Sequence, residues 1–134
     1  MKLDSAQVQE RELLVFSRGY DPDNYRMGGI RYFDSMSVGT AKKLLDKGYI
    51  DPDDTQNCSP TMRDMIDFCD DGTDKWYLHG YVVSPERDDC RITFEGVGSV
   101  SDLTQEEAFR FLRDFRFADE LECDAGCHAY CWFD

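Results

Sequence analysis

The sequence predicts a single small α+β domain, spanning residues 1–134, with about four helices and a small, mainly antiparallel sheet. Two observations support this prediction. Several segments repeat apolar residues at helical spacing, whereas a central hairpin at about 75–96 alternates apolar and polar residues as strands do. Helices are expected before and after that hairpin, an order that is typical of α+β folds rather than of repeated β-α-β units.

The first third of the chain predicts a helix, a loop and a second helix. Residues 3–16 carry apolar side chains among Gln, Glu and Arg, which indicates a helix, although the last four of them would also fit a strand. The apolar residues of this segment are Val8, Leu13, Leu14 and Phe16. Residues 19–29 combine proline, asparagine and a glycine pair and indicate a loop. After a short extended segment at 30–33, Ser37 is expected to cap a helix that runs to Lys47.

A third helix and the hairpin follow. Ser59, with Pro60 after it, is expected to cap a helix that ends at Gly72, because the hydroxyl can accept a hydrogen bond from a free helix amide. Residues 75–83 then alternate between two faces, and a polar turn connects them to a second alternating segment at 90–96. The sequence therefore places a hairpin at the centre of the sheet.

The last third predicts a fourth helix and a terminal sheet region. Thr104 and Glu107 form a capping box at the start of that helix. The apolar stripe expected on the helix consists of Ala108, Phe109, Leu112 and Phe115. Beyond it, Phe117, Leu121 and the closing residues 129–133 predict one or two short strands.

Negative charge is the most unusual feature of the composition. The chain holds 28 acidic and 15 basic residues, which gives a formal net charge of −13. Residues 51–74 hold eight acids and one base, a net of −7, and residues 117–134 hold five acids and no base, a net of −5. Such a surface repels the phosphate backbone, so direct binding to nucleic acid is not expected.

The charge leads to the principal hypothesis, a non-enzymatic protein–protein interaction module that binds another protein with a basic surface. Tyrosine and tryptophan are frequent anchors of such interfaces, so an aromatic residue near the C-terminus joins the acids as a candidate. The candidate partner-binding residues are Asp51, Asp53, Asp54, Asp70, Asp71, Asp74 and Trp132. Whether the two acidic segments share one face depends on the fold.

A first alternative is an acidic inhibitor that imitates nucleic acid. Carboxylates presented at phosphate-like intervals would occupy the cationic groove of a nucleic-acid-binding enzyme. Aspartate, which dominates the acids of this chain, holds its charge close to the backbone and would favour a defined pattern.

A second alternative is a metal site or a small active site. Cys123, Cys127, His128 and Cys131 offer soft ligands within nine residues, although they lack the two separate ligand pairs that are typical of structural zinc sites. His79, which lies between two tyrosines on its strand face, could act as a general base. No nucleophile motif accompanies either histidine, so the sequence favours a binding protein and assigns no cofactor.

The expected location is the cytoplasm. No apolar run is long enough to span a bilayer, and residues 1–9 lack the basic start and apolar stretch of a secretory signal. In a reducing compartment the six cysteines are expected to be free thiols rather than a disulfide framework. Neither a membrane nor a particular oligomeric state is predicted.

Overall fold

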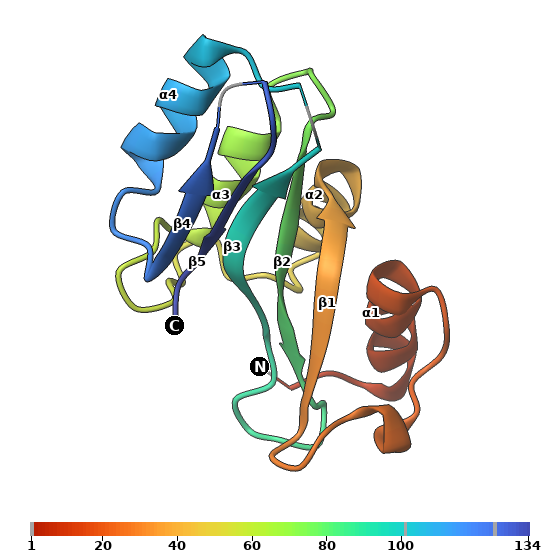
Figure 1. The fold of residues 1–134 in the computed structure, drawn as a ribbon. Helices are drawn as coiled ribbons and strands as arrows, with labels where there is room; N and C mark the ends of the chain where they lie inside the picture. The colour runs from red at the N-terminus through yellow and green to blue at the C-terminus, as the bar shows by residue number, and fades with distance from the viewer. Residues whose placement is uncertain (1, 101, 125) are drawn as a thin grey trace.

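The fold is an α+β single small domain, as predicted, with four helices and a five-stranded antiparallel sheet (Figure 1). The structure is a computed structural model that describes residues 2–100, 102–124 and 126–134. The helices are α1 (Ser5–Phe16), α2 (Val38–Asp46), α3 (Met62–Cys69) and α4 (Gln105–Asp114), with a 3-10 turn η1 (Pro22–Asn24). The strands are β1 (Ile30–Ser37), β2 (Trp76–Val83), β3 (Ile92–Ser99), β4 (Glu120–Cys123) and β5 (Ala129–Trp132). In the part of the chain that the structure describes, no helix combines the length and the hydrophobicity that crossing a membrane requires.

The sheet has the strand order β1-β2-β3-β5-β4. The predicted central hairpin is confirmed as β2 and β3, but β3 continues to Ser99, so that Gly96 and Gly98 lie inside the strand rather than at its exit. The last strand, β5, is inserted between β3 and β4. Because of that insertion, β4 becomes an edge strand of the sheet, opposite to the edge formed by β1.

The hydrophobic core lies between the sheet and the helices, and Figure 1 shows α2 and α3 behind the strands. Four of its aromatic rings come from three elements: Phe68 from α3, Trp76 from β2, and Phe111 and Phe115 from α4. The Phe68 ring lies 4.8 Å from both the Trp76 ring and the Phe115 ring, measured between centroids. Edge-to-face contacts of this kind add to the burial of apolar area. They fix α4 against α3 and β2.

Helix α1 is attached to the sheet by buried charged side chains. Arg11 is 1% exposed and donates a hydrogen bond to the carbonyl oxygen of Val83 at 3.2 Å. Glu12 is completely buried and accepts a hydrogen bond from the hydroxyl of Tyr25 at 2.7 Å, and burial raises its pKa. By contrast, Leu13 is 54% exposed. Leu14 and Phe16 are partly buried against the core, so apolar packing and the buried charged side chains together hold the helix in place.

The helix caps follow the predictions at α2 and α4. The Ser37 hydroxyl accepts a hydrogen bond from the amide of Thr40 at 3.2 Å. At α4 the capping box is complete: the Thr104 hydroxyl accepts from the Glu107 amide at 3.1 Å, and the Glu107 carboxylate accepts from the Thr104 amide at 2.8 Å. Each such cap contributes about 1 kcal/mol.

Helix α3 begins two residues later than predicted. Thr61, not Ser59, caps it by accepting a hydrogen bond from the amide of Asp64 at 3.1 Å. The Ser59 hydroxyl instead donates to the carbonyl of Pro60 and accepts from the amide of Gln56, which closes the preceding turn. Serine and threonine both make good caps, so the residue types could not distinguish the two positions.

Gly96 is the position at which the fold tolerates a side chain least. A Cβ there would fall on the carbonyl oxygen of Cys131 and 2.5 Å from the imidazole Nε2 of His79. We expect Gly96→Ala to lower the free energy of unfolding by about 2 to 3 kcal/mol, because β3 and β5 would have to separate. Equilibrium unfolding in urea measures this.

A matched control is Gly39→Ala in α2, where the nearest atom to an added Cβ is the Ser37 hydroxyl at 3.9 Å. That variant is expected to raise the free energy of unfolding by about 0.5 to 1 kcal/mol, since alanine has the better helix propensity. Equal stability of the Gly96→Ala variant and the unmodified protein would contradict the close approach of β5 to β3.

Candidate functional site

The acids of residues 51–74 do not form one continuous surface. Asp51 and Asp54 line a cavity of about 320 Å³ near the β2–β3 turn, whereas Asp70 lies beside α2, where it forms an ion pair with Lys42 at 3.0 Å. Asp53 and Asp74 are exposed, as is Asp70. Part of the local negative charge is thus compensated within the fold.

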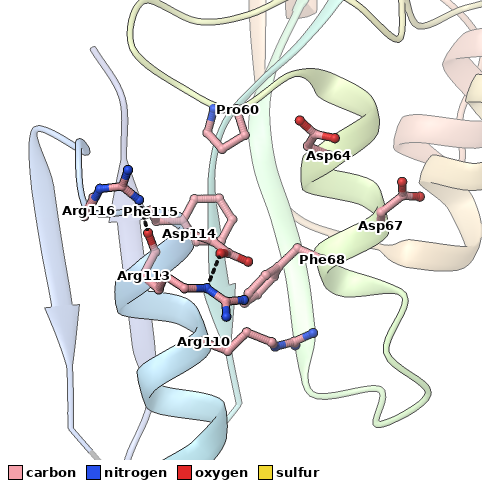
Figure 2. A pocket seen from close by; sticks show the side chains of 9 residues that line it. All are labelled: Pro60, Asp64, Asp67, Phe68, Arg110, Arg113, Asp114, Phe115 and Arg116. Atoms are coloured by element: carbon pink, nitrogen blue, oxygen red, sulfur yellow. Dashed lines mark hydrogen bonds and ion pairs between the residues drawn. The ribbon is translucent and has the colours of Figure 1, made fainter.

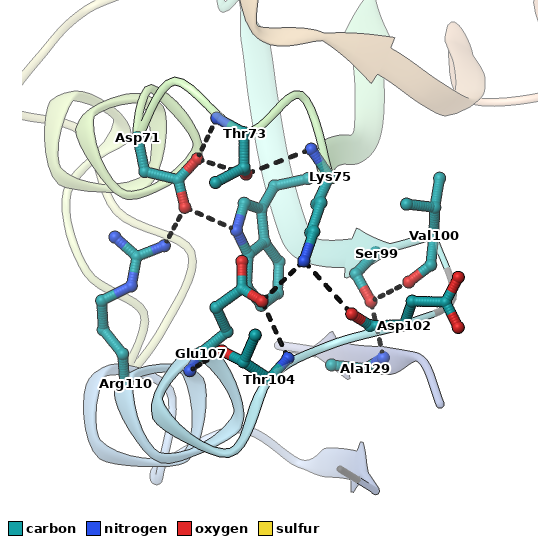
Figure 3. Close-up of polar contacts among 11 residues, drawn as sticks. Asp71, Thr73, Lys75, Ser99, Val100, Asp102, Thr104, Glu107, Arg110 and Ala129 are labelled. Carbon is teal, nitrogen blue, oxygen red and sulfur yellow. Dashed lines mark hydrogen bonds and ion pairs between the residues drawn. The ribbon is translucent and has the colours of Figure 1, made fainter. Parts of the chain in front are cut away.

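Asp71 is fully engaged inside the domain, as Figure 3 shows. One oxygen of its carboxylate accepts hydrogen bonds from the amide and the hydroxyl of Thr73, at 3.0 and 2.6 Å. The other accepts from the indole Nε1 of Trp76 at 2.9 Å and from the guanidinium of Arg110 at 2.6 Å. Its side chain is only 15% exposed. Asp71 thereby joins the end of α3, the start of β2 and helix α4.

A second ion pair supports the same corner. The Lys75 ammonium lies 2.8 Å from the Glu107 carboxylate and donates to the carbonyl oxygen of Asp102 at 3.1 Å (Figure 3). Hydrogen bonds from Lys75 and from the backbone of Thr104 lower the pKa of Glu107. Lys75, which immediately precedes β2, therefore links the start of that strand to the N-terminus of α4.

A groove with a volume of about 500 Å³ lies between α3 and α4 (Figure 2). Phe68 and Phe115 supply its apolar surface, and Pro60 lies at its rim. Its charged lining residues are Asp64, Asp67, Asp114, Arg110, Arg113 and Arg116. Three acids and three bases leave the groove without net charge, so it offers no selective attraction for a cation or an anion.

Four apolar side chains are exposed on α4, on β4 and on the segment that connects them. We call this set the α4–β4 apolar surface, and its residues are Phe109, Leu112, Phe117 and Leu121. Phe109 and Phe117 are 62% and 66% exposed, and the two leucines are each 37% exposed. Exposed apolar residues that gather in one patch are typical of interaction sites, whereas single ones are common on any surface.

The helical period explains how α4 produces this surface. Residues 108, 111 and 115 point to the core, whereas Arg110 faces Asp71 on the α3 side. At 100° per residue, Leu112 and Phe109 lie on the opposite flank. Cys123 of β4 lies 3.9 Å from the carbonyl of Ala108. Leu121 precedes Cys123 by two residues on the same face of β4, so it lies toward the C-terminal half of α4, which carries Leu112.

The predicted anchor Trp132 borders this region on the other face of the sheet. Across the strand pair, Glu120 stands opposite Trp132 and Glu122 stands opposite Tyr130. The indole Nε1 of Trp132 donates a hydrogen bond to the Glu95 carboxylate at 3.3 Å, and its ring remains half-exposed. Trp132 therefore accompanies the C-terminal acids rather than those of residues 51–74.

His79 has a structural role in this geometry. It is 8% exposed, its ring stacks on Tyr130 with a centroid distance of 4.8 Å, and its Nε2 lies 2.7 Å from the carbonyl of Cys131. Burial lowers its pKa, which favours the neutral ring. A register shift after His79 places it opposite Gly96 and takes Glu95 out of the pairing. The residue opposite His79 across the strand pair is therefore a glycine, not the carboxylate of Glu95.

The C-terminal cysteines and histidine are not brought together. Cys131 is completely buried, and burial raises its pKa to about 12, whereas Cys127 and His128 are exposed in the turn between β4 and β5. Cys123 faces α4. Within the described ranges, no three His, Cys, Asp or Glu side chains are grouped as metal ligands would be. The fold separates them because Cys127 and His128 lie in the turn outside the sheet, whereas the Cys131 side chain lies in the core.

Sequence reasoning missed the role of Phe109 and Leu112, which it assigned to the buried stripe of the fourth helix. The signal was present: α4 carries more apolar residues than one face can bury, and Phe111 completes the inward stripe without these two.

Comparisons with protein-family models, with curated proteins and with solved structures gave no match to this chain.

Asp71 makes stability depend on pH. Burial by itself would raise its pKa, but the hydrogen bonds from Thr73 and Trp76 and the charge of Arg110 outweigh burial and lower it. Because this pKa is lower in the folded protein, the ionised carboxylate of Asp71 stabilises the fold at pH values above the ordinary aspartate range. That stabilisation is lost as the pH falls through the folded-state pKa. We expect Asp71→Asn to lower the free energy of unfolding at pH 7 by about 1 to 3 kcal/mol.

The difference between the Asp71→Asn variant and the unmodified protein should shrink as the pH is lowered below the ordinary aspartate range, because protonation of the native carboxylate removes its contribution. Urea unfolding at a series of pH values gives this dependence. A difference that stays constant over these pH values would show that the charge of Asp71 does not carry the effect.

The six thiols should differ in reactivity. Cys58 and Cys127 are exposed, whereas Cys69, Cys90 and Cys131 are buried. Burial raises the pKa of Cys69 and Cys131, which further suppresses their thiolate form. Under native conditions we expect iodoacetamide to alkylate Cys58 and Cys127 at least tenfold faster than the buried three, as followed by peptide mass spectrometry. Rapid modification of Cys131 would contradict its place in the core.

Proposed function

We propose that this protein is a non-enzymatic protein-interaction module and that it docks its partner on the α4–β4 apolar surface. One observation carries the proposal: Phe109 and Phe117 expose more than three fifths of their surface beside two further apolar residues. In contrast, Phe68, Phe94, Phe111, Phe115 and Phe133 are buried in the core. Covering two exposed phenylalanines releases a large apolar area from water, which is the main driving force for association.

The charge around the docking surface supports a basic partner. Residues 117–134 contain five acids and no lysine or arginine, and Glu120 and Glu122 lie directly on β4. These acids form a margin on the β4 side of the surface, whereas Arg116 lies over the ring of Phe117, 4.5 Å from its centroid. An acidic margin beside an apolar centre favours a positively charged partner. Such a margin raises the association rate and discourages acidic competitors.

The acids predicted at 51–74 contribute to this proposal in different ways. Asp51, Asp53 and Asp74 are exposed and add to the long-range field that attracts a basic protein. Asp70 and Asp71 form intramolecular ion pairs, so their charge is partly neutralised before any partner arrives. The proposed contact surface therefore lies on α4 and β4 and not on residues 51–74, which the sequence had indicated.

The experiment is affinity capture from a cell extract, followed by quantitative binding of the captured protein in purified form. We expect Phe117→Ser and Phe109→Ser each to weaken that binding about tenfold or more, because exposed aromatic residues at the centre of an interface contribute most of its affinity. The matched control is Met27→Ser, since Met27 is fully exposed at a distance in the fold from α4 and should leave binding unchanged.

Two outcomes would contradict the proposal. If both phenylalanine variants bind the partner as tightly as the unmodified protein does, the docking surface lies elsewhere. If the captured protein is a nucleic-acid enzyme whose binding is competed by double-stranded DNA and collapses steeply with salt, the chain is an acidic mimic of nucleic acid instead. Circular dichroism of each variant establishes that it is folded.

A further inference from the structure

We infer that β4 binds its partner by strand addition: an extended segment that alternates apolar and basic residues pairs with the outer edge of β4. This inference rests on the proposed function, because it specifies how a protein partner is held on the α4–β4 apolar surface. Three features of the molecule carry it: a free strand edge, the alternation of side chains along that edge, and the sign of the charge beside it.

The outer edge of β4 is free of backbone partners among the described residues. The strand pairs with β5 alone, and no other backbone hydrogen bond reaches residues 120–123 (Figure 1). In an antiparallel edge strand every second residue directs its N–H and C=O groups away from the sheet. An extended peptide can supply the missing partners, which is a recurring mode of peptide recognition.

The opposite edge of the sheet is less suited to the same role. The register between β1 and β2 shifts between Phe33 and Met36, which makes the β1 edge irregular. Irregular or covered edges resist pairing with another chain. Of the two edges, β4 is the regular one and the one that adjoins exposed apolar side chains.

Side chains of β4 point alternately to two chemically different faces. Cys123 faces α4, and Leu121 shares that face because side chains alternate along a strand. Glu120 and Glu122 lie on the other face, opposite Trp132 and Tyr130. An added strand would follow the same alternation. One set of its side chains would pack on Leu121 and the apolar residues of α4, and the other set would meet two carboxylates.

The charge decides between a second copy of this chain and a different partner. Two copies joined through β4 would place Glu120 and Glu122 of each copy beside the same acids of the other, and like charges on adjacent strands destabilise pairing. A segment with lysine or arginine at alternate positions would instead form ion pairs with them. The half-exposed ring of Trp132 offers the same cations a favourable aromatic face.

The test uses the full chain and two synthetic peptides of equal composition. One is a blocked ten-residue peptide of alternating lysine and valine, and the other carries five lysines followed by five valines. We expect the alternating peptide to bind at least tenfold more tightly at low ionic strength by isothermal titration calorimetry. We also expect it to slow amide hydrogen exchange at residues 120–124.

Charge variants give the control. The double variant Glu120→Lys, Glu122→Lys should weaken binding of the alternating peptide about tenfold or more. The matched double variant Asp23→Lys, Glu86→Lys makes the same change of net charge at two exposed positions outside β4, and should weaken binding no more than about threefold. An equal loss in both double variants would mean that the peptide responds only to net charge, and would overturn the inference.

The remaining outcomes separate the two proposals. Strand addition is wrong if the alternating peptide does not bind, if both peptides bind alike, or if exchange slows elsewhere in the chain. If, in that case, the Phe117→Ser variant no longer binds the natural partner, docking on the α4–β4 apolar surface is supported and only strand addition is rejected. If Phe117→Ser and Phe109→Ser both keep the natural partner, the proposed function itself fails, whatever the peptides do.

Discussion

The close approach of β5 to β3 is the constraint on which the arrangement of this molecule depends. Gly96 has no Cβ, so the backbone of Cys131 can lie against it, and the carbonyl of Cys131 meets the imidazole of His79 at 2.7 Å. Tyr130 then stacks on His79 and pairs with Gly98. With β5 held in the interior of the sheet, β4 has no position left except the edge.

A second constraint sets the rotation of α4 about its own axis. Asp71 holds both the indole of Trp76 and the guanidinium of Arg110, while Phe68 contacts two aromatic rings on the other elements. With Arg110 fixed on the α3 side and Phe111 in the core, the flank that carries Phe109 must face outward. The exposed apolar surface is therefore a consequence of how a charged and aromatic corner is packed, not of a shortage of core volume.

The negative charge of the chain serves different purposes in different places. Near α3 it is largely structural, because Asp70 and Asp71 neutralise Lys42 and Arg110. In residues 117–134 no lysine or arginine accompanies it, and Glu120 and Glu122 give β4 the negative charge on which the proposed basic partner depends. The same residue types thus stabilise one part of the fold and supply specificity in another.

The sequence by itself determined the local structure. Alternation along β2 and β3, the cap at Ser37 and the capping box at Thr104 are short-range patterns, and residues within a few positions of one another satisfy them. Only the tertiary structure decided that Asp71 is an internal hydrogen-bond acceptor, that Cys131 is buried away from Cys127, and that β4 lies at an edge. Those outcomes depend on which strand pairs with which, and on the rotation of a helix against partners far away in the chain. Strand pairing and helix rotation are both set by contacts between residues far apart in the chain, which a local sequence pattern does not reveal.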